Sequence, residues 1–139
     1  MHILKTLLAF TAGCVSICTP AAAHEVDDDL VTKVGTSQIV LARTAGLLAF
    51  CDKPGLRRTV IDRISRNGLD EVLASTKPEL VVDTLAAVIM RVDTYATGLE
   101  SGLTLAQLSP ERKAEICDRT MTLTDKLLAE DKKGSKPAK

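Results

Sequence analysis

Aromatic residues are almost missing from this chain of 139 residues, which has one tyrosine, two phenylalanines and no tryptophan. Without aromatic rings to stack on bases, it lacks the usual means of holding single-stranded nucleic acid. An excess of charge of either sign is missing as well, because 18 basic side chains balance 18 acidic ones. No overall field draws the chain to nucleic acid or to an anionic membrane, so we expect no nucleic-acid partner.

Residues that carry catalysis or hold metals are also scarce. The chain has two histidines, His2 and His24, and only His24 remains if residues 1–23 are removed, as argued below. An N-terminal histidine can bind copper, but such sites normally need a second imidazole. A catalytic base needs a rigidly held side chain, which a chain terminus does not provide. Carboxylates such as Asp83 and Asp93 fall on the polar face of a predicted helix, where proton transfer near neutrality is poorly served. The sequence predicts no enzyme, no metal and no cofactor.

Residues 1–23 have the pattern of a secretory signal peptide. Lys5 gives a positively charged start, Thr6–Cys18 is an uncharged apolar run, and Ala21–Ala23 offer small residues for cleavage. The run is too short for a membrane span, which needs about 20 apolar residues. Cleavage after Ala23 would place the protein in the periplasm or outside the cell, with no transmembrane segment left.

A second processing route stays open. Ala12-Gly13-Cys14 matches the end of a bacterial lipobox, which would leave Cys14 lipidated at a membrane surface. Thr11 stands where that pattern prefers an aliphatic residue, however, and the apolar run continues past the cysteine. Ordinary cleavage therefore remains the main prediction, and a buried N-terminal helix is the other alternative.

Export leaves Cys51 and Cys117 as the remaining pair of the four cysteines. In an oxidising compartment an even pair predicts one disulfide. The loop that it closes is long, and chain entropy then stabilises the fold by about 4 kcal/mol. A redox pair or a metal site is the alternative, but redox motifs usually keep their cysteines close in sequence, and no histidine lies near either residue.

Leucine, alanine and charged residues abound, and no segment alternates as a strand does. These features predict an all-α fold, a small bundle of four to five helices in residues 24–130 held by the Cys51–Cys117 disulfide, with 131–139 as a flexible basic tail. The clearest pattern runs from Thr76 to Leu99, where Thr76 and Glu79 have capping-box spacing. We expect this segment to be the central helix. Its apolar stripe comprises Val81, Leu85, Val88, Val92, Tyr95 and Leu99, widened by Ile89 and Ala96.

Turn signals set the other expected helices. Pro54-Gly55 ends the first helix, and Asn67-Gly68 is a predicted helix stop. Gly98 and Gly102 suggest that the central helix frays, while Ser109 and Pro110 have the pattern of an N-cap and first turn. The remaining predicted helices cover residues 30–51, 56–67, 69–75 and 110–130.

The first predicted helix is apolar on nearly every side, since Arg43 is its only charge between Val34 and Cys51. Such a helix is either enclosed by its neighbours or presents a surplus face to a partner. The next helix carries a basic cluster that can dock an acidic partner, although a solvated face is the simpler interpretation. The residues predicted to contact a partner are Ile39, Arg43, Leu47, Phe50, Arg58, Arg63 and Arg66.

Two functions follow as hypotheses. The first is a non-enzymatic exported protein that binds a protein partner in the bacterial envelope through these residues, in the geometry of a helix and a groove. The second is a carrier of a small apolar ligand held in a cavity between helices, which the leucine-, valine- and alanine-rich composition suggests.

Overall fold

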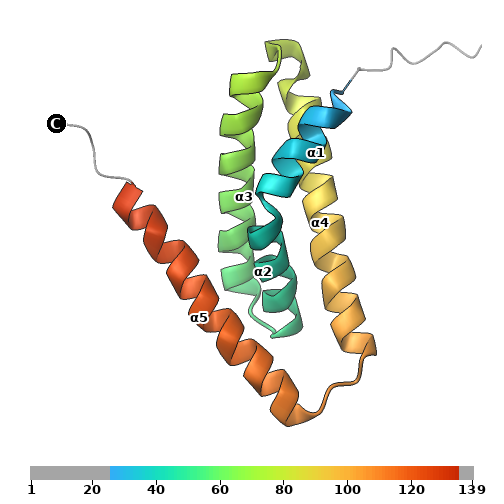
Figure 1. Cartoon of the computed structure of the whole chain (residues 1–139), viewed down its shortest axis with the longest axis vertical. Coiled ribbons are helices and arrows are strands. Elements are labelled where there is room, and N and C mark those ends of the chain that lie inside the picture. Colours follow the sequence, from blue (N-terminus) through green and yellow to red (C-terminus); the bar gives the residue numbers. More distant parts are fainter. Residues whose placement is uncertain (1–25, 135–139) are drawn as a thin grey trace, which may run out of the picture.

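The computed structural model describes residues 26–134, and within this range it is built from helices alone (Figure 1). The predicted all-α bundle is confirmed. The predicted signal peptide, with Cys14, and residues 135–139 of the predicted tail lie outside the described residues. The elements are α1 (Asp28–Ser37), α2 (Ile39–Phe50), α3 (Pro54–Ser75), the 3₁₀ helix η1 (Pro78–Leu80), α4 (Val81–Leu105) and α5 (Pro110–Gly134).

The helix predicted over residues 30–51 is broken in two at Gln38. This residue has φ −94° and ψ 6°, and its side chain is buried. The Gln38 amide donates to Ser37 Oγ at 3.0 Å and to Glu71 Oε1 at 3.2 Å, and its oxygen accepts from Asn67 Nδ2 at 3.3 Å. At this break the buried Gln38 side chain reaches partners on α3, so its polar atoms are hydrogen-bonded in the interior.

The stop predicted at Asn67-Gly68 is also wrong, because α3 runs through both residues. Gly68 is buried, and a Cβ atom placed on it would lie 3.4 Å from Leu85 Cδ1 and 3.9 Å from Val34 Cγ1. The glycine thus lets α3 lie close to α1 and α4. This packing outweighs the intrinsic helix penalty of glycine, about 1 kcal/mol.

The capping box predicted at Thr76 is not formed. Thr76 has an extended backbone and ends α3, with its N–H donating to Val72 O at 3.0 Å. The chain then turns through η1, which Pro78 begins, and α4 starts at Val81.

The far end of α4 differs from the prediction too. The helix continues past Gly98 and Gly102 to Leu105. Leu99 and Leu103 are half-buried one turn apart, and their packing keeps this end helical although the glycines weaken it.

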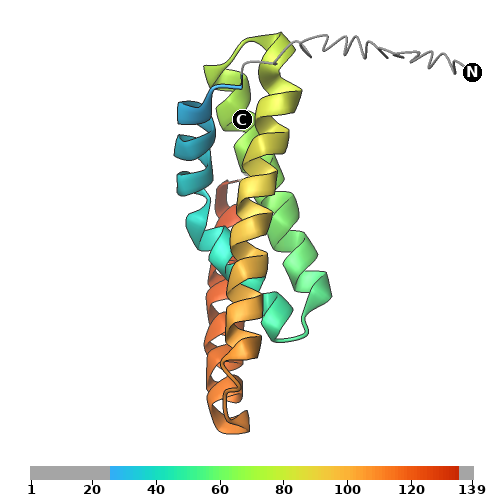
Figure 2. The same cartoon turned by 90° about the vertical axis from the view of Figure 1, so that its right-hand side faces the viewer.

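The central helix is α2, not the segment predicted for that place. α2 contacts α1, α3, α4 and α5, whereas α4 packs mainly against α1, α2 and α3. The two views show α3 and α4 as an antiparallel pair with α1 and α2 laid along one side (Figures 1 and 2). α2 can pack on several sides because it carries a single charge among small and apolar residues, while α4 has one apolar face.

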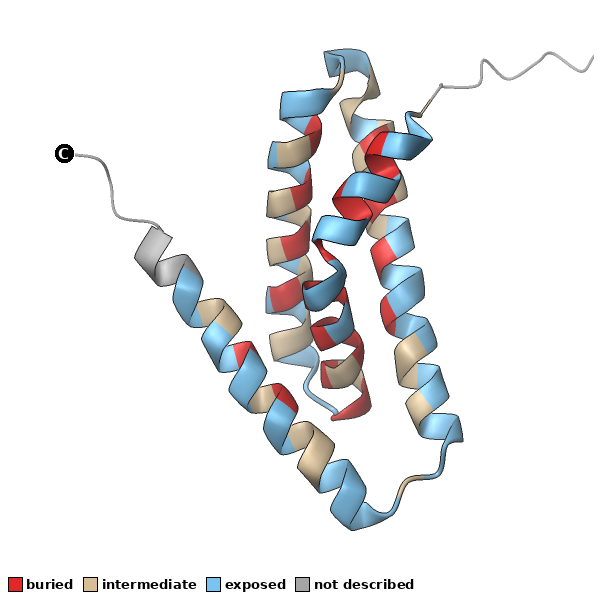
Figure 3. Ribbon diagram, viewed as in Figure 1, coloured by how far each residue is buried: buried red, intermediate tan, exposed pale blue. Residues whose placement is uncertain are grey.

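Two clusters of buried residues form the interior, and Figure 3 marks the buried positions in red. On α4, Val88, Val92 and Ala96 of the predicted stripe are buried, but Tyr95 is 42% exposed and Thr84 is buried in addition. The burial follows steps of four residues along α4, and this spacing leaves Tyr95 at the edge of the packed face. The first cluster comprises Leu41, Ala42, Ala45, Leu48, Val60, Ile64, Val92 and Ala96. The second comprises Leu30, Val31, Val34, Val72 and Val88.

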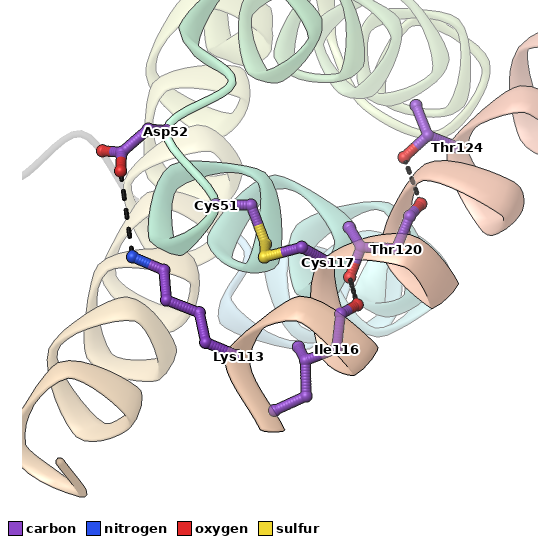
Figure 4. The surroundings of a disulfide bond; sticks show 7 residues. All are labelled: Cys51, Asp52, Lys113, Ile116, Cys117, Thr120 and Thr124. Carbon is purple, nitrogen blue, oxygen red and sulfur yellow. Dashed lines mark hydrogen bonds and ion pairs between the residues drawn. A yellow bond between two sulfur atoms is a disulfide. The ribbon is translucent and has the colours of Figure 1, made fainter. Parts of the chain in front are cut away.

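α5 packs mainly on α2 and diverges from α4 along its length (Figure 1). The predicted disulfide is confirmed: Cys51 and Cys117 join the end of α2 to the first half of α5, with their Cα atoms 5.7 Å apart (Figure 4). Beside it, Lys113 Nζ lies 3.8 Å from a carboxylate oxygen of Asp52. α5 begins at Pro110, as predicted, and extends beyond the predicted end at Glu130 to Gly134.

Candidate partner-binding groove

An open groove lies between α4 and α5, with α2 as its floor. Its volume is about 440 Å³. In Figure 1, α5 diverges from α4, and α2 lies between them. The groove is lined by Val40, Arg43, Leu47, Leu99, Leu103, Ile116, Arg119, Thr120 and Leu123.

The floor is a stripe of α2 that its neighbours leave open. Val40, Arg43 and Leu47 recur at steps of three and four residues, so they share one side of the helix. Most of the other α2 residues are buried, whereas Val40 is 52% exposed. Both sequence interpretations of this helix therefore apply in part, since it is largely enclosed and still presents one apolar stripe.

α5 supplies a wall with the same spacing. Ile116, Arg119 and Leu123 repeat the floor's order of apolar residue, arginine and apolar residue. One step round the helix, Thr120 and Thr124 are buried, and their hydroxyls donate to Ile116 O and Thr120 O on their own helix (Figure 4). α5 therefore packs Thr120 and Thr124 against the bundle with their hydroxyls hydrogen-bonded, while Ile116 and Leu123 line the groove.

The charges that line the groove are two arginines. Arg43 forms no ion pair with any described residue. Arg119 is 78% exposed, and its Nη2 lies 2.7 Å from Glu115 Oε1, one turn earlier on α5. Asp and Glu are absent from the described lining, so the groove combines apolar walls with positive charge.

The residues predicted for partner contact separate into different environments. Arg43 and Leu47 lie in the groove. Ile39 is exposed but lines a smaller depression with Tyr95 and Arg91, of about 320 Å³. Phe50 is 9% exposed, with Lys113 Nζ 5.0 Å from its ring centroid, and it therefore belongs to the packed interior and not to a contact face.

The predicted basic cluster is not brought to the groove. Arg58 and Arg66 are exposed on α3, and neither lines the groove. Arg63 is half-buried, and its Nη1 donates to the backbone oxygen of Leu127. Arg63 thus ties α5 to α3 and has a structural role.

Sequence reasoning missed most of the walls. Leu103 lies just beyond Gly102, where the sequence predicts fraying, and no sequence motif marks Leu123. A sequence signal for the walls does exist, because Leu99 and Leu103 stand at helical spacing, as do Ile116 and Leu123. Periodicity predicts that such residues share one face of a helix, but it does not predict that the faces of α4 and α5 diverge and leave a groove.

Among residues 26–134 no group of three or more His, Cys, Asp and Glu side chains is placed to hold a metal ion. None of the described helices is both long and apolar enough to span a membrane. Compared with protein families, curated proteins and solved structures, the chain matches no family, no protein and no structure.

Proposed function

We propose that this chain is a non-enzymatic exported protein, periplasmic or secreted, that binds a protein partner of the bacterial envelope by accepting a helix of that partner in the groove. The observation that carries the proposal is an open, apolar groove framed by α2, α4 and α5. Export is supported by the signal pattern of residues 1–23, and the disulfide suits an oxidising compartment.

The dimensions of the groove suit a helix. Val40 to Leu47 on the floor, and Ile116 to Leu123 on the wall, each span about two helical turns, roughly 10 Å. A docked helix would insert apolar side chains at positions i, i+3 or i+4, and i+7, which is the usual pattern of helix-in-groove recognition. Exposed apolar side chains beside half-buried ones supply the area that such a contact removes from water.

A small apolar ligand is the second candidate, and one observation favours it. The groove's volume of about 440 Å³ falls within the range of ligand pockets. Such pockets enclose most of their ligand, however, and Val40 and Leu123 remain exposed to solvent here. The open form of the groove favours a helix over an enclosed molecule.

Site-specific photocrosslinking in the source cell tests the proposal. A benzophenone side chain is placed at Val40 or at Leu123, and at exposed Leu73 of α3 as the matched control. We expect adducts from the two groove positions that mass spectrometry maps to a single helix of one protein. Adding Leu123→Asp to the Val40 probe should abolish the adduct without changing the circular dichroism spectrum.

The contrary outcomes are distinct. Adducts equal to those at Leu73 would exclude the groove as a protein-docking site. Retention of a lipid or other small molecule in native mass spectrometry, with its loss in the Leu123→Asp variant, would favour the carrier.

Export is tested separately by the mass of the mature protein. We expect a chain beginning at His24. A diacylated chain beginning at Cys14 would indicate the lipoprotein route, and an intact Met1 in the cytoplasm would contradict export.

A further inference from the structure

We infer that the groove selects an acidic amphipathic helix, whose carboxylates meet Arg43 and Arg119 while its apolar stripe covers the groove. This inference rests on the proposed function and names the chemistry of the partner. It is carried by the placement of two arginines among apolar walls without an acidic residue in the described lining.

The positive charge of Arg43 determines that the partner carries a negative charge at this position. It stands between Val40 and Leu47 on the floor, and no ion pair with a described residue neutralises it. In the free protein water solvates its guanidinium. A helix that covers the floor removes that water, and a buried unpaired charge is strongly unfavourable. A partner must therefore bring an anion to this position, and the anion available on a helix is an Asp or Glu carboxylate.

Arg119 adds a second contact on the wall. Its pair with Glu115 is on the surface, where such pairs contribute little and rearrange easily. The guanidinium carries five N–H donors in a planar fork, so it can hold Glu115 and a second carboxylate together. Glu115 and Asp118 on α5 are the acidic neighbours of this arginine, and neither lines the groove.

The helix that fits has a defined pattern. It carries Leu, Ile or Val at i, i+3 or i+4, and i+7, with Asp or Glu beside that stripe to meet Arg43 on the floor of the groove and Arg119 on its wall. A basic helix with the same stripe would place like charges together and is disfavoured.

Two synthetic helical peptides test this inference. They share one leucine stripe and differ only in having Glu or Lys along its edges, and their binding to oxidised mature protein is measured by fluorescence anisotropy. We expect the Glu peptide to bind at least about tenfold more tightly, with the preference shrinking at high salt. The double change Arg43→Glu and Arg119→Glu should reverse the preference. Arg58→Gln, which removes an exposed arginine outside the groove, should leave it unchanged.

The failures of the two proposals are distinguishable. Equal binding of both peptides, lost in Leu123→Asp, would overturn the charge selection and leave the groove as a helix-binding site. A preference for Glu that Arg58→Gln reduces as much as Arg43→Gln would also overturn it, since general surface charge would then be responsible. Absence of binding by either peptide, or binding that Leu123→Asp does not affect, would count against the groove itself.

Discussion

Gly46 of α2 lies directly against the backbone of Ala96 in α4. A Cβ atom placed on Gly46 would stand 2.6 Å from the carbonyl oxygen of Ala96 and 3.2 Å from its Cα. The two helices therefore meet backbone to backbone at this crossing, and the carbonyl oxygen cannot move aside as a flexible side chain would. Gly46 has no side chain, and this allows α2 to lie against α4 in the centre of the bundle.

Replacing Gly46 by alanine should therefore destabilise the fold. Forcing a methyl group into a packed contact costs about 1–3 kcal/mol, which urea denaturation followed by circular dichroism will measure. The matched control is Gly98→Ala, because nothing lies within 4 Å of a Cβ placed there. That variant should gain about 0.5–1 kcal/mol from the better helix propensity of alanine. Equal stabilities of the two variants would contradict the close crossing.

Helical periodicity and the cysteine count predicted the class of fold and its disulfide, because neither signal depends on which distant side chains pack together. Helical periodicity identified Val88, Val92 and Ala96 as buried, and cysteine counting paired Cys51 with Cys117. The helix boundaries failed where tertiary contacts overrode local preference. Gly68 has the local pattern of a stop but is a packing site.

The candidate site shows the same division. Arg43 was recognisable from sequence as the lone charge of an apolar helix, whereas Leu103 and Leu123 became site residues only through the divergence of α4 and α5. Gln38 is the other example: its bonds to Glu71 and Asn67 join residues that are far apart in the chain, and no local pattern reports them.

Thr84 provides a second stability test. It is fully buried on α4, and its hydroxyl finds no hydrogen-bond partner among the described residues. Removing a buried, unsatisfied hydroxyl without changing the side chain's shape should stabilise the protein, so we expect Thr84→Val to gain about 1 kcal/mol in urea denaturation. The control is Thr44→Val. Thr44 is equally buried, but its hydroxyl donates to Val40 O at 2.8 Å, and its loss should bring no gain. A destabilised Thr84→Val variant would mean that the hydroxyl has a partner.

The start of α5 should respond to acid. Hydrogen bonds from backbone N–H and from Ser109 to the carboxylate lower the pKa of Glu111. Because the folded-state pKa is the lower one, its contribution to stability is present above the unfolded-state value and is lost as pH falls through the folded-state value. Urea denaturation from neutral pH into the acidic range should therefore show a slightly shallower loss of stability for Glu111→Gln than for the wild type. Identical profiles would show that this cap contributes nothing.

The disulfide should control α5 more than the rest of the bundle. Both buried clusters consist of residues from α1 to α4, and α5 adds only the half-buried Met121 and Leu127 to them. The Cys51–Cys117 bond spans 66 positions, so replacing both cysteines by alanine should cost up to about 4 kcal/mol. The loss should concentrate in α5, because the contacts that the described residues then offer it are mainly its packing on α2, the Arg63 bond to Leu127 and the pair of Lys113 with Asp52.

Hydrogen exchange tests where that loss falls. In the double alanine variant the amides of α5 should exchange much faster, while those of α3 and α4 keep most of their protection. Wild type treated with a reductant should behave in the same way, which controls for the substitutions themselves. Because α5 is one wall of the groove, binding of the Glu-edged peptide should weaken together with α5 protection. Uniform loss of protection across all helices would instead mean that the disulfide supports the whole bundle, and unchanged protection in α5 would mean that its packing on α2 is sufficient.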